Sequence, residues 1–265
     1  MVICPLCRKP LICDSKSWHC EDGHSFDVAR QGYVNLLTVQ QKHSLHPGDT
    51  KEMVLARRQF LDAGYYRPIG ETLRTLVCEY APQAEAVLDV GCGEGYYLSH
   101  LSHIPQRYGV DISKEAVRYA AGHYKDTCWL TATASHLPFA QGSFDCLLSM
   151  FALTMEEEYA RVLKKDGIFV QVLAGKSHLT ALKNIIYPTL VEKEKDLQPE
   201  LQGFTLLHSE TLNFDFHVQH REQVQNLLSM TPHVWRISKA AAEALANTDT
   251  LSDCAEVILN VYRRN

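Results

Sequence analysis

The first 24 residues contain cysteine and histidine side chains with the spacing of a metal site. Cys4 and Cys7 form one close pair, and after twelve intervening residues Cys20 and His24 form a second. Two such pairs, each on a tight turn, provide the four ligands of a tetrahedral zinc ion, and the residues between them form a hairpin. Because four protein ligands leave no position for water, we expect a structural zinc ion. Metal binding would supply the folding free energy of this small segment, about 10–16 kcal/mol.

Two other interpretations of these cysteines stay open. A Cys-x-x-Cys pair also serves as a redox dithiol, although such a pair normally accompanies a βαβ pattern. The cysteines could also be buried without a metal. Cys13 and His19 are not expected to bind the ion, because Cys13 falls inside the hairpin and His19 faces away from the neighbouring Cys20 on an extended strand.

A glycine-rich loop is the second feature that could perform chemistry. A short apolar segment ends at Asp89, and alternate glycines follow before a predicted helix. Glycines let backbone N–H groups approach a ligand closely, but the dinucleotide fingerprint Gly-x-Gly-x-x-Gly is one residue longer than this loop. The pattern Asp-x-Gly-x-Gly-x-Gly resembles that of class I methyltransferases, which bind S-adenosylmethionine. The residues expected at this cofactor are Asp89, Gly91, Gly93, Glu94, Gly95 and Tyr96.

Further candidates follow at the ends of the next predicted strands. The segment 107–113 has a strand pattern that ends in Asp111, an acid that can accept hydrogen bonds from both ribose hydroxyls. The turn within 133–139 precedes a strand that opens with Phe144-Asp145, and in class I methyltransferases such a turn lies beside the adenine. We therefore expect Ser135, His136 and Leu137 near the cofactor.

The order of these elements predicts the fold class. Strands, helices and turns alternate from residue 86 to 170, and two more strands are expected at 211–219 and 256–262. Such an order gives a parallel sheet with right-handed crossovers. We expect an α/β class I methyltransferase with a Rossmann-like seven-stranded sheet that contains one antiparallel strand. The predicted domains are a zinc module at 1–36, a linker with a helix at 37–75 and a methyltransferase domain at 76–265.

Composition and charge restrict the class of protein. The 265 residues are 46% hydrophobic and 22% charged, as in ordinary globular chains. No apolar run approaches the length of a membrane helix and no secretory signal is apparent, so we expect a cytoplasmic protein that contacts no membrane. The first 75 residues have a net charge of +2 and the rest −7. An RNA partner would therefore contact mainly the N-terminal part.

Several segments together resemble one family, the RlmA-type bacterial 23S rRNA guanine-N1 methyltransferases. The segments are Cys-Pro-Leu-Cys at 4–7, Gly-His-Ser-Phe-Asp at 23–27, Gly-Tyr-Val-Asn-Leu-Leu at 32–37, Pro-Gly-Asp at 47–49, Ala-Arg-Arg-x-Phe-Leu-Asp-Ala-Gly at 56–64, the loop at 88–97 and Met-Thr-Pro at 230–232 with Trp235. The resemblance implies a zinc module that helps to recognise RNA, and methyl transfer to N1 of a guanine in a 23S rRNA hairpin. It also implies that Tyr66 and His178 lie at the cofactor.

The sequence departs from that family pattern in two places. Residues 151–154, Phe-Ala-Leu-Thr, replace an Ala-Pro after the fourth strand, and Lys-Asp-Gly at 165–167 replaces a Pro-Gly-Gly turn. The first departure borders the expected pocket for the target base.

The sequence identifies no catalytic base for removing the proton from the target nitrogen. Arg57 and Arg58, in a predicted helix near 53–61, are expected on a solvated helix face rather than at a phosphate.

Two rival functions are compatible with the motifs alone. One is a small-molecule methyltransferase in which the zinc hairpin supports a homodimer. The other is a zinc-ribbon protein that binds RNA or ribosomes and whose methyltransferase-like domain is catalytically silent.

Overall fold

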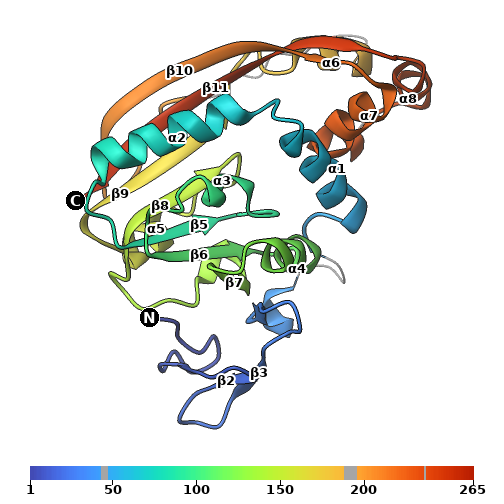
Figure 1. The fold of residues 1–265 in the computed structure, drawn as a ribbon. Coiled ribbons are helices and arrows are strands. Elements are labelled where there is room, and N and C mark those ends of the chain that lie inside the picture. The colour runs from blue at the N-terminus through green and yellow to red at the C-terminus, as the bar shows by residue number, and fades with distance from the viewer. Residues whose placement is uncertain (43–46, 188–195, 236) are drawn as a thin grey trace.

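Two sheets organise the molecule, which a computed structural model describes at residues 1–42, 47–187, 196–235 and 237–265 (Figure 1). A small antiparallel sheet near the N-terminus contains β1 (Ile12–Cys13), β2 (Ser17–His19) and β3 (Ser25–Asp27). The large sheet has eight strands. In spatial order they are β10 (Phe204–Val218), β11 (Leu251–Arg264), β9 (Leu163–Ala174), β8 (Phe144–Met150), β5 (Ala86–Val90), β6 (Gln106–Asp111), β7 (Cys128–Thr131) and β4 (Val34–Asn35).

The large sheet confirms the predicted class I topology and adds one strand to it. Strands β5 to β9 run parallel, and β11 is antiparallel to both of its neighbours. The eighth strand is β4, which pairs in parallel with β7 and comes from the segment that follows the zinc hairpin. From β5 the chain winds through β6 and β7 in one direction, and then continues through β8 and β9 in the other. The switch between β5 and β8 is where ligands bind in sheets of this type.

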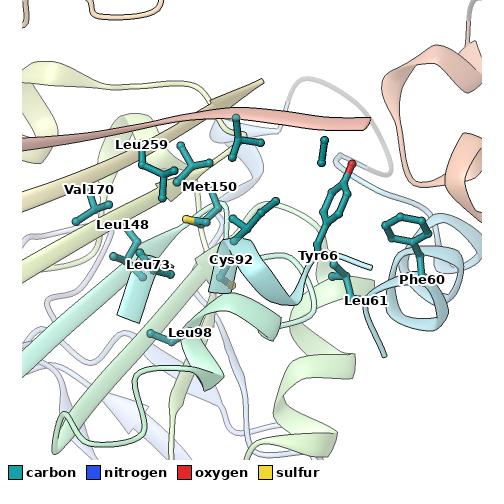
Figure 2. Packing of buried hydrophobic residues seen from close by; sticks show 14 of the residues in the cluster. Phe60, Leu61, Tyr66, Leu73, Cys92, Leu98, Leu148, Met150, Val170 and Leu259 are labelled. Atoms are coloured by element: carbon teal, nitrogen blue, oxygen red, sulfur yellow. The ribbon is translucent and has the colours of Figure 1, made fainter. Parts of the chain in front are cut away.

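Helices cover both faces of the large sheet. The helices are α1 (Lys51–Asp62), α2 (Arg67–Tyr80), α3 (Tyr96–Ser99), α4 (Lys114–His123), α5 (Glu156–Val162), α6 (Thr180–Ile186), α7 (Arg221–Ser229) and α8 (Lys239–Ala246), with 3-10 turns η1 (Val39–Gln41), η2 (Ala134–His136) and η3 (Pro232–Trp235). Buried side chains of α1, α2 and α4 share one core with strands of the sheet, whereas α5 belongs to the core of the opposite face. Figure 2 shows Phe60 and Tyr66 next to each other at one end of the first core, which also contains Leu148, Val170 and Leu259 of the sheet.

The N-terminal segment is joined directly to the large sheet and its loops. Val2 forms an antiparallel bridge with Phe139, and the amide of Ile3 donates to the Pro138 carbonyl at 2.9 Å. The predicted domain boundaries at 36/37 and 75/76 stay predictions. The structure adds that β4 lies in the large sheet and that α2 continues through residue 75.

Candidate cofactor site and metal centre

The four predicted zinc ligands converge in the N-terminal hairpin. The Sγ atoms of Cys7 and Cys20 are 3.6 Å apart, and His24 Nδ1 lies 3.5 Å from Cys4 Sγ and 3.4 Å from Cys20 Sγ. All four ligand atoms lie within 4.8 Å of one another. Tetrahedral zinc with bonds of about 2.0–2.3 Å sets neighbouring ligand atoms about 3.5–3.8 Å apart. The residues therefore fit a structural zinc ion.

Two other side chains of the hairpin that could bind a metal, Cys13 and His19, lie outside the cluster. Cys13 is exposed on β1, and its thiol donates to the Leu11 carbonyl at 3.7 Å. His19 is exposed at the end of β2. Among the residues whose positions the structure gives, the metal-binding cluster consists of Cys4, Cys7, Cys20 and His24, as predicted from their spacing.

The glycine loop turns sharply between β5 and α3 and packs against its neighbours. The amides of Gly91 and Cys92 donate to the Val110 carbonyl of β6 at 2.8 and 3.1 Å. Gly95 has φ +89°, and a Cβ there would lie 2.5 Å from the Trp129 ring. A side chain at Gly95 is thus excluded both by conformation and by space. Cys92 is buried in the core beneath the loop, as expected for a packing residue.

Asp111 orders the loop from the end of β6. Its Oδ2 accepts the Gly93 amide at 2.9 Å, and its Oδ1 accepts the Ser113 amide at 2.8 Å. The Ala132 amide donates to the Asp111 carbonyl at 3.1 Å, so the segment after β7 begins beside the same residue. A carboxylate fixed at this edge of the sheet can accept further hydrogen bonds from ribose hydroxyls.

Buried acidic atoms with no hydrogen-bond partner lie at the loop. Both carboxylate oxygens of Asp89 and the Glu94 Oε2 atom are buried and accept no hydrogen bond from the described part of the chain. Burial, and then the charges of Asp111 and Glu94, raise the pKa of Asp89 to about 8. Burial also raises the pKa of Glu94, although Arg57 opposes this shift. Unpartnered buried acceptors are costly unless a ligand or water supplies donors. The ammonium group, hydroxyls and cationic sulfonium of S-adenosylmethionine fit such a site.

Arg57 corrects one expectation from the sequence. It was predicted on a solvated face, but its side chain is only 23% exposed and its Nη1 lies 2.5 Å from Asp49 Oδ2 and 3.9 Å from Glu94 Oε2. Its Nη2 donates to the Met230 carbonyl at 3.2 Å. Arg57 therefore joins the linker helix α1, the glycine loop and the segment after α7.

Arg58 is also not on a solvated face. Its side chain is 17% exposed, pairs with Asp62 at 2.6 Å and donates to the Tyr124 hydroxyl at 2.5 Å. The sequence offered one indication of these packed roles. The Pro-Gly-Asp turn at 47–49 precedes the helix, and Asp49 is the partner of Arg57.

Tyr66 and His178, which are distant in the sequence, meet at the carboxyl edge of the sheet. The Tyr66 hydroxyl lies 3.1 Å from His178 Nε2, and both residues are buried. Burial and the charge of Asp253 raise the pKa of Tyr66 above its ordinary value, so its hydroxyl stays protonated at neutral pH. The structure thus brings together two residues that only the family resemblance had implicated.

The predicted adenine-side residues have different environments. Ser135 and His136 are exposed on η2, where Ser135 Oγ lies 3.1 Å from His136 Nδ1. Leu137 is fully buried, and its amide donates to Glu158 Oε1 at 2.5 Å. Contact of these three residues with the cofactor stays a prediction.

The fold and the two sites define a class I methyltransferase with an N-terminal zinc ribbon. Residues 88–171 match the family model of a methyltransferase domain, and residues 2–45 match the model described as "RlmA, N-terminal". Among the described residues, no helix is long and apolar enough to cross a membrane.

Relatives that match most of this chain identify its family. A protein of Streptomyces fradiae named 23S rRNA (guanine(748)-N(1))-methyltransferase is 33% identical over 88% of this chain and 85% of its own length. A protein of Micromonospora griseorubida that is provisionally named a 23S rRNA (guanine-N(1)-)-methyltransferase is 32% identical over 98% of this chain and 96% of its own. The corresponding Bacillus subtilis protein YxjB is 30% identical over 90% and 88%. This chain belongs to the family of 23S rRNA (guanine-N1)-methyltransferases.

Proposed function

We propose that this protein transfers a methyl group from S-adenosylmethionine to N1 of one guanine in a hairpin of 23S rRNA. The observation that supports this most directly is the set of buried carboxylate oxygens of Asp89 and Glu94 at the glycine loop that accept no hydrogen bond from the described residues. A zinc-ribbon module occurs in the same chain, and relatives named for this activity match nearly its full length. We also infer that the protein works in the cytoplasm, and we leave a homodimer as a prediction.

The chain's residues would bind and orient the reactants. When bound, S-adenosylmethionine supplies the methyl group on its sulfonium. Asp111 would accept the ribose hydroxyls, and Asp89 and Glu94 would face the cationic end of the cofactor. Ser135, His136 and Leu137 would border the adenine. Tyr66 and His178 would form the wall between the cofactor and the target base. Because methyl transfer is an in-line displacement, such positioning provides most of the catalysis.

Guanine N1 imposes two further requirements. It is paired in a Watson–Crick duplex, so the target base must be unpaired or extruded from the stack. It also has a proton that must leave as the bond from N1 to the methyl carbon forms and the bond from that carbon to sulfur breaks. The zinc module would contact the hairpin backbone and set its register, since phosphate contacts position a protein on RNA without specifying a base.

Primer extension on 23S rRNA tests this function. A methyl on guanine N1 blocks pairing, so reverse transcriptase should stop one nucleotide before the modified position. We expect one stop that disappears in a strain lacking the protein and returns when the wild-type gene is restored. Restoring the Asp111→Ala variant should not return the stop, because a loss of about 1.5–3 kcal/mol per charged hydrogen bond weakens cofactor binding. If no stop in 23S rRNA depends on the protein, the small-molecule alternative replaces this proposal.

A further inference from the structure

Phe151 combines exposure with a strained backbone at the edge of the candidate site. It follows the last residue of β8 and has φ +55°, a conformation that is a true outlier for a bulky side chain. The residue is 40% exposed, whereas the other described aromatic side chains except Trp235 are buried or half-buried. Strained residues persist only where the surrounding structure fixes them, and they concentrate at functional sites.

The loop that contains Phe151 is held in place from three directions. The Phe151 amide donates to the Val172 carbonyl of β9 at 2.9 Å. Gln171 Nε2 donates to Thr154 Oγ1 at 2.8 Å, and the Tyr159 hydroxyl donates to the Leu153 carbonyl at 2.9 Å. These bonds hold the backbone of the loop at Phe151, Leu153 and Thr154, and so fix where the Phe151 side chain leaves the chain.

The same loop lies directly against the glycine loop. A Cβ added at Gly91 would lie 2.8 Å from the Ala152 Cβ atom. The Phe151 ring centroid is 5.9 Å from that of His178, 6.2 Å from that of Tyr97 and 6.4 Å from that of Tyr66. Phe151 therefore extends a group of aromatic rings, which begins at the buried Tyr66–His178 pair, to the molecular surface.

We propose that Phe151 is the stacking platform for the target guanine, which lies on the exposed part of the ring with its N1 edge toward the cofactor. The inference rests on the proposed function and assigns a base-contacting residue to it. An unstacked purine presents a flat apolar face that an aromatic ring can cover, and this contact partly replaces the stacking lost when the base leaves the RNA helix. Because the loop that contains Phe151 packs against Gly91 through Ala152, a base stacked on Phe151 would also be positioned relative to the cofactor.

Three variants and the wild type test this inference on an unmodified 23S rRNA hairpin transcript. Phe151→Leu keeps an apolar side chain but removes the flat ring, whereas Phe151→Tyr keeps the ring. Leu207→Ala is the matched control, since Leu207 is a similarly exposed apolar residue, 39% exposed, near the start of β10, away from the carboxyl edge. We expect kcat/KM for RNA to fall about tenfold or more in Phe151→Leu and to change little in the other two.

Two further measurements separate stacking from a structural effect. Calorimetry should give the same Kd for S-adenosylmethionine in Phe151→Leu and in the wild type. A 2-aminopurine placed at the target position should be less fluorescent when bound to the wild type or to Phe151→Tyr, where it stacks on a ring, than when bound to Phe151→Leu. An unchanged kcat/KM in Phe151→Leu, or an equal loss of cofactor affinity, overturns the stacking role while leaving the proposed function intact. A wild-type protein that methylates no RNA overturns both.

Discussion

At the scale of single residues, the candidate cofactor site contains more acidic than basic side chains. Asp89, Glu94 and Asp111 lie within the site, and Arg57 is the cation that contacts it from α1. Burial disfavours the charged form of each carboxyl group, and their mutual repulsion adds to this effect. A cationic ligand would relieve both, so the site is electrostatically complementary to S-adenosylmethionine.

The raised pKa of Asp89 predicts how the free energy of unfolding depends on pH. Its pKa is raised from 3.8 to about 8 by burial and by neighbouring carboxylates, so between these pH values the folded protein holds a proton that the unfolded chain has lost. Stability then decreases as pH rises, because the folded state binds more protons than the unfolded state. Without cofactor, the free energy of unfolding should fall from pH 5 to pH 8 in the wild type, and less steeply in Asp89→Asn.

Denaturant unfolding at both pH values measures this difference. Asp145→Asn is the control. Although burial alone would raise the pKa of Asp145, Lys164 and two backbone amides lower it, so that carboxyl is ionised in both states throughout this pH range. Its substitution should leave the pH dependence as in the wild type. If the wild type and Asp89→Asn have parallel pH dependences, the Asp89 carboxyl is not protonated in the folded protein.

At the scale of elements, the turn that positions His178 depends on β11. Asp253 of β11 is buried, and its two carboxylate oxygens accept the amides of Ala181 and Leu182 at 3.0 and 2.8 Å. Leu179, directly after His178, has φ +57°. A left-handed residue at that point needs support from outside the turn, and Asp253 provides it.

Asp253→Asn should therefore loosen this turn. The amide side chain can accept through one oxygen only, which leaves one of the two backbone amides without its acceptor at a cost of about 1–3 kcal/mol in the free energy of unfolding. Because the Tyr66–His178 contact depends on the turn, the affinity for S-adenosylmethionine should fall as well. Urea unfolding and calorimetry measure the two effects.

A neighbouring residue supplies the control for Asp253. Glu256 Oε1 accepts the Ser177 amide at 3.1 Å from the other side of the turn, and Glu256→Gln keeps a single acceptor for this single bond. It should change both quantities less than Asp253→Asn does. Equal effects of the two substitutions would contradict a specific role for Asp253.

Elements with local signals were predictable from the sequence, and contacts between distant elements were not. The strands that end at Asp89 and Asp111 have apolar runs followed by an acid and a turn, so their order and the fold class were predictable. The helical spacing of 53–61 correctly predicted α1. The burial of Arg57 was indicated only by Asp49 in the nearby Pro-Gly-Asp turn, because it also depends on Glu94 and Met230, which only the tertiary fold brings to that helix.

The zinc ligands were predictable for the same reason, and β4 was not. All four ligands lie within 21 residues, and their spacing is itself the signal. The strand β4 is two residues long and is defined by its pairing with β7 and a bridge from Val34 to Val28, so no periodic pattern could reveal it.

At the scale of the whole molecule, the zinc hairpin and the large sheet share one hydrophobic core. Cys4 and Cys20 belong to the same buried cluster as Val34 of β4, Leu130 of β7 and Phe139. The glycine loop residue Cys92 and the Tyr66 side chain belong to the core on the opposite face. The zinc hairpin thus packs on the face that also contains Leu137 of the predicted adenine-side turn, while Cys92 and Tyr66 of the candidate cofactor site pack on the other.

This division predicts how loss of zinc should act. Wild-type protein should contain about one zinc ion per chain, and Cys20→Ser should contain far less, because the substitution removes one of the three thiolate ligands of a closed structural site. Without the ion, the hairpin has too small a core to stay folded, so amides of residues 4–27 should exchange rapidly with deuterium. The affinity for S-adenosylmethionine should be retained, since the second core does not include the ligands. Methylation of the RNA hairpin should fall through a higher KM, because the module that would position the RNA is lost.

Cys13→Ser, which changes an exposed cysteine outside the cluster, should leave the metal content, the rate of amide exchange and the KM for RNA unchanged. A Cys20→Ser protein that keeps its zinc and its KM would show that this cluster does not hold the ion, and one that loses cofactor binding as fully as RNA methylation would show that the two faces of the sheet are not independent.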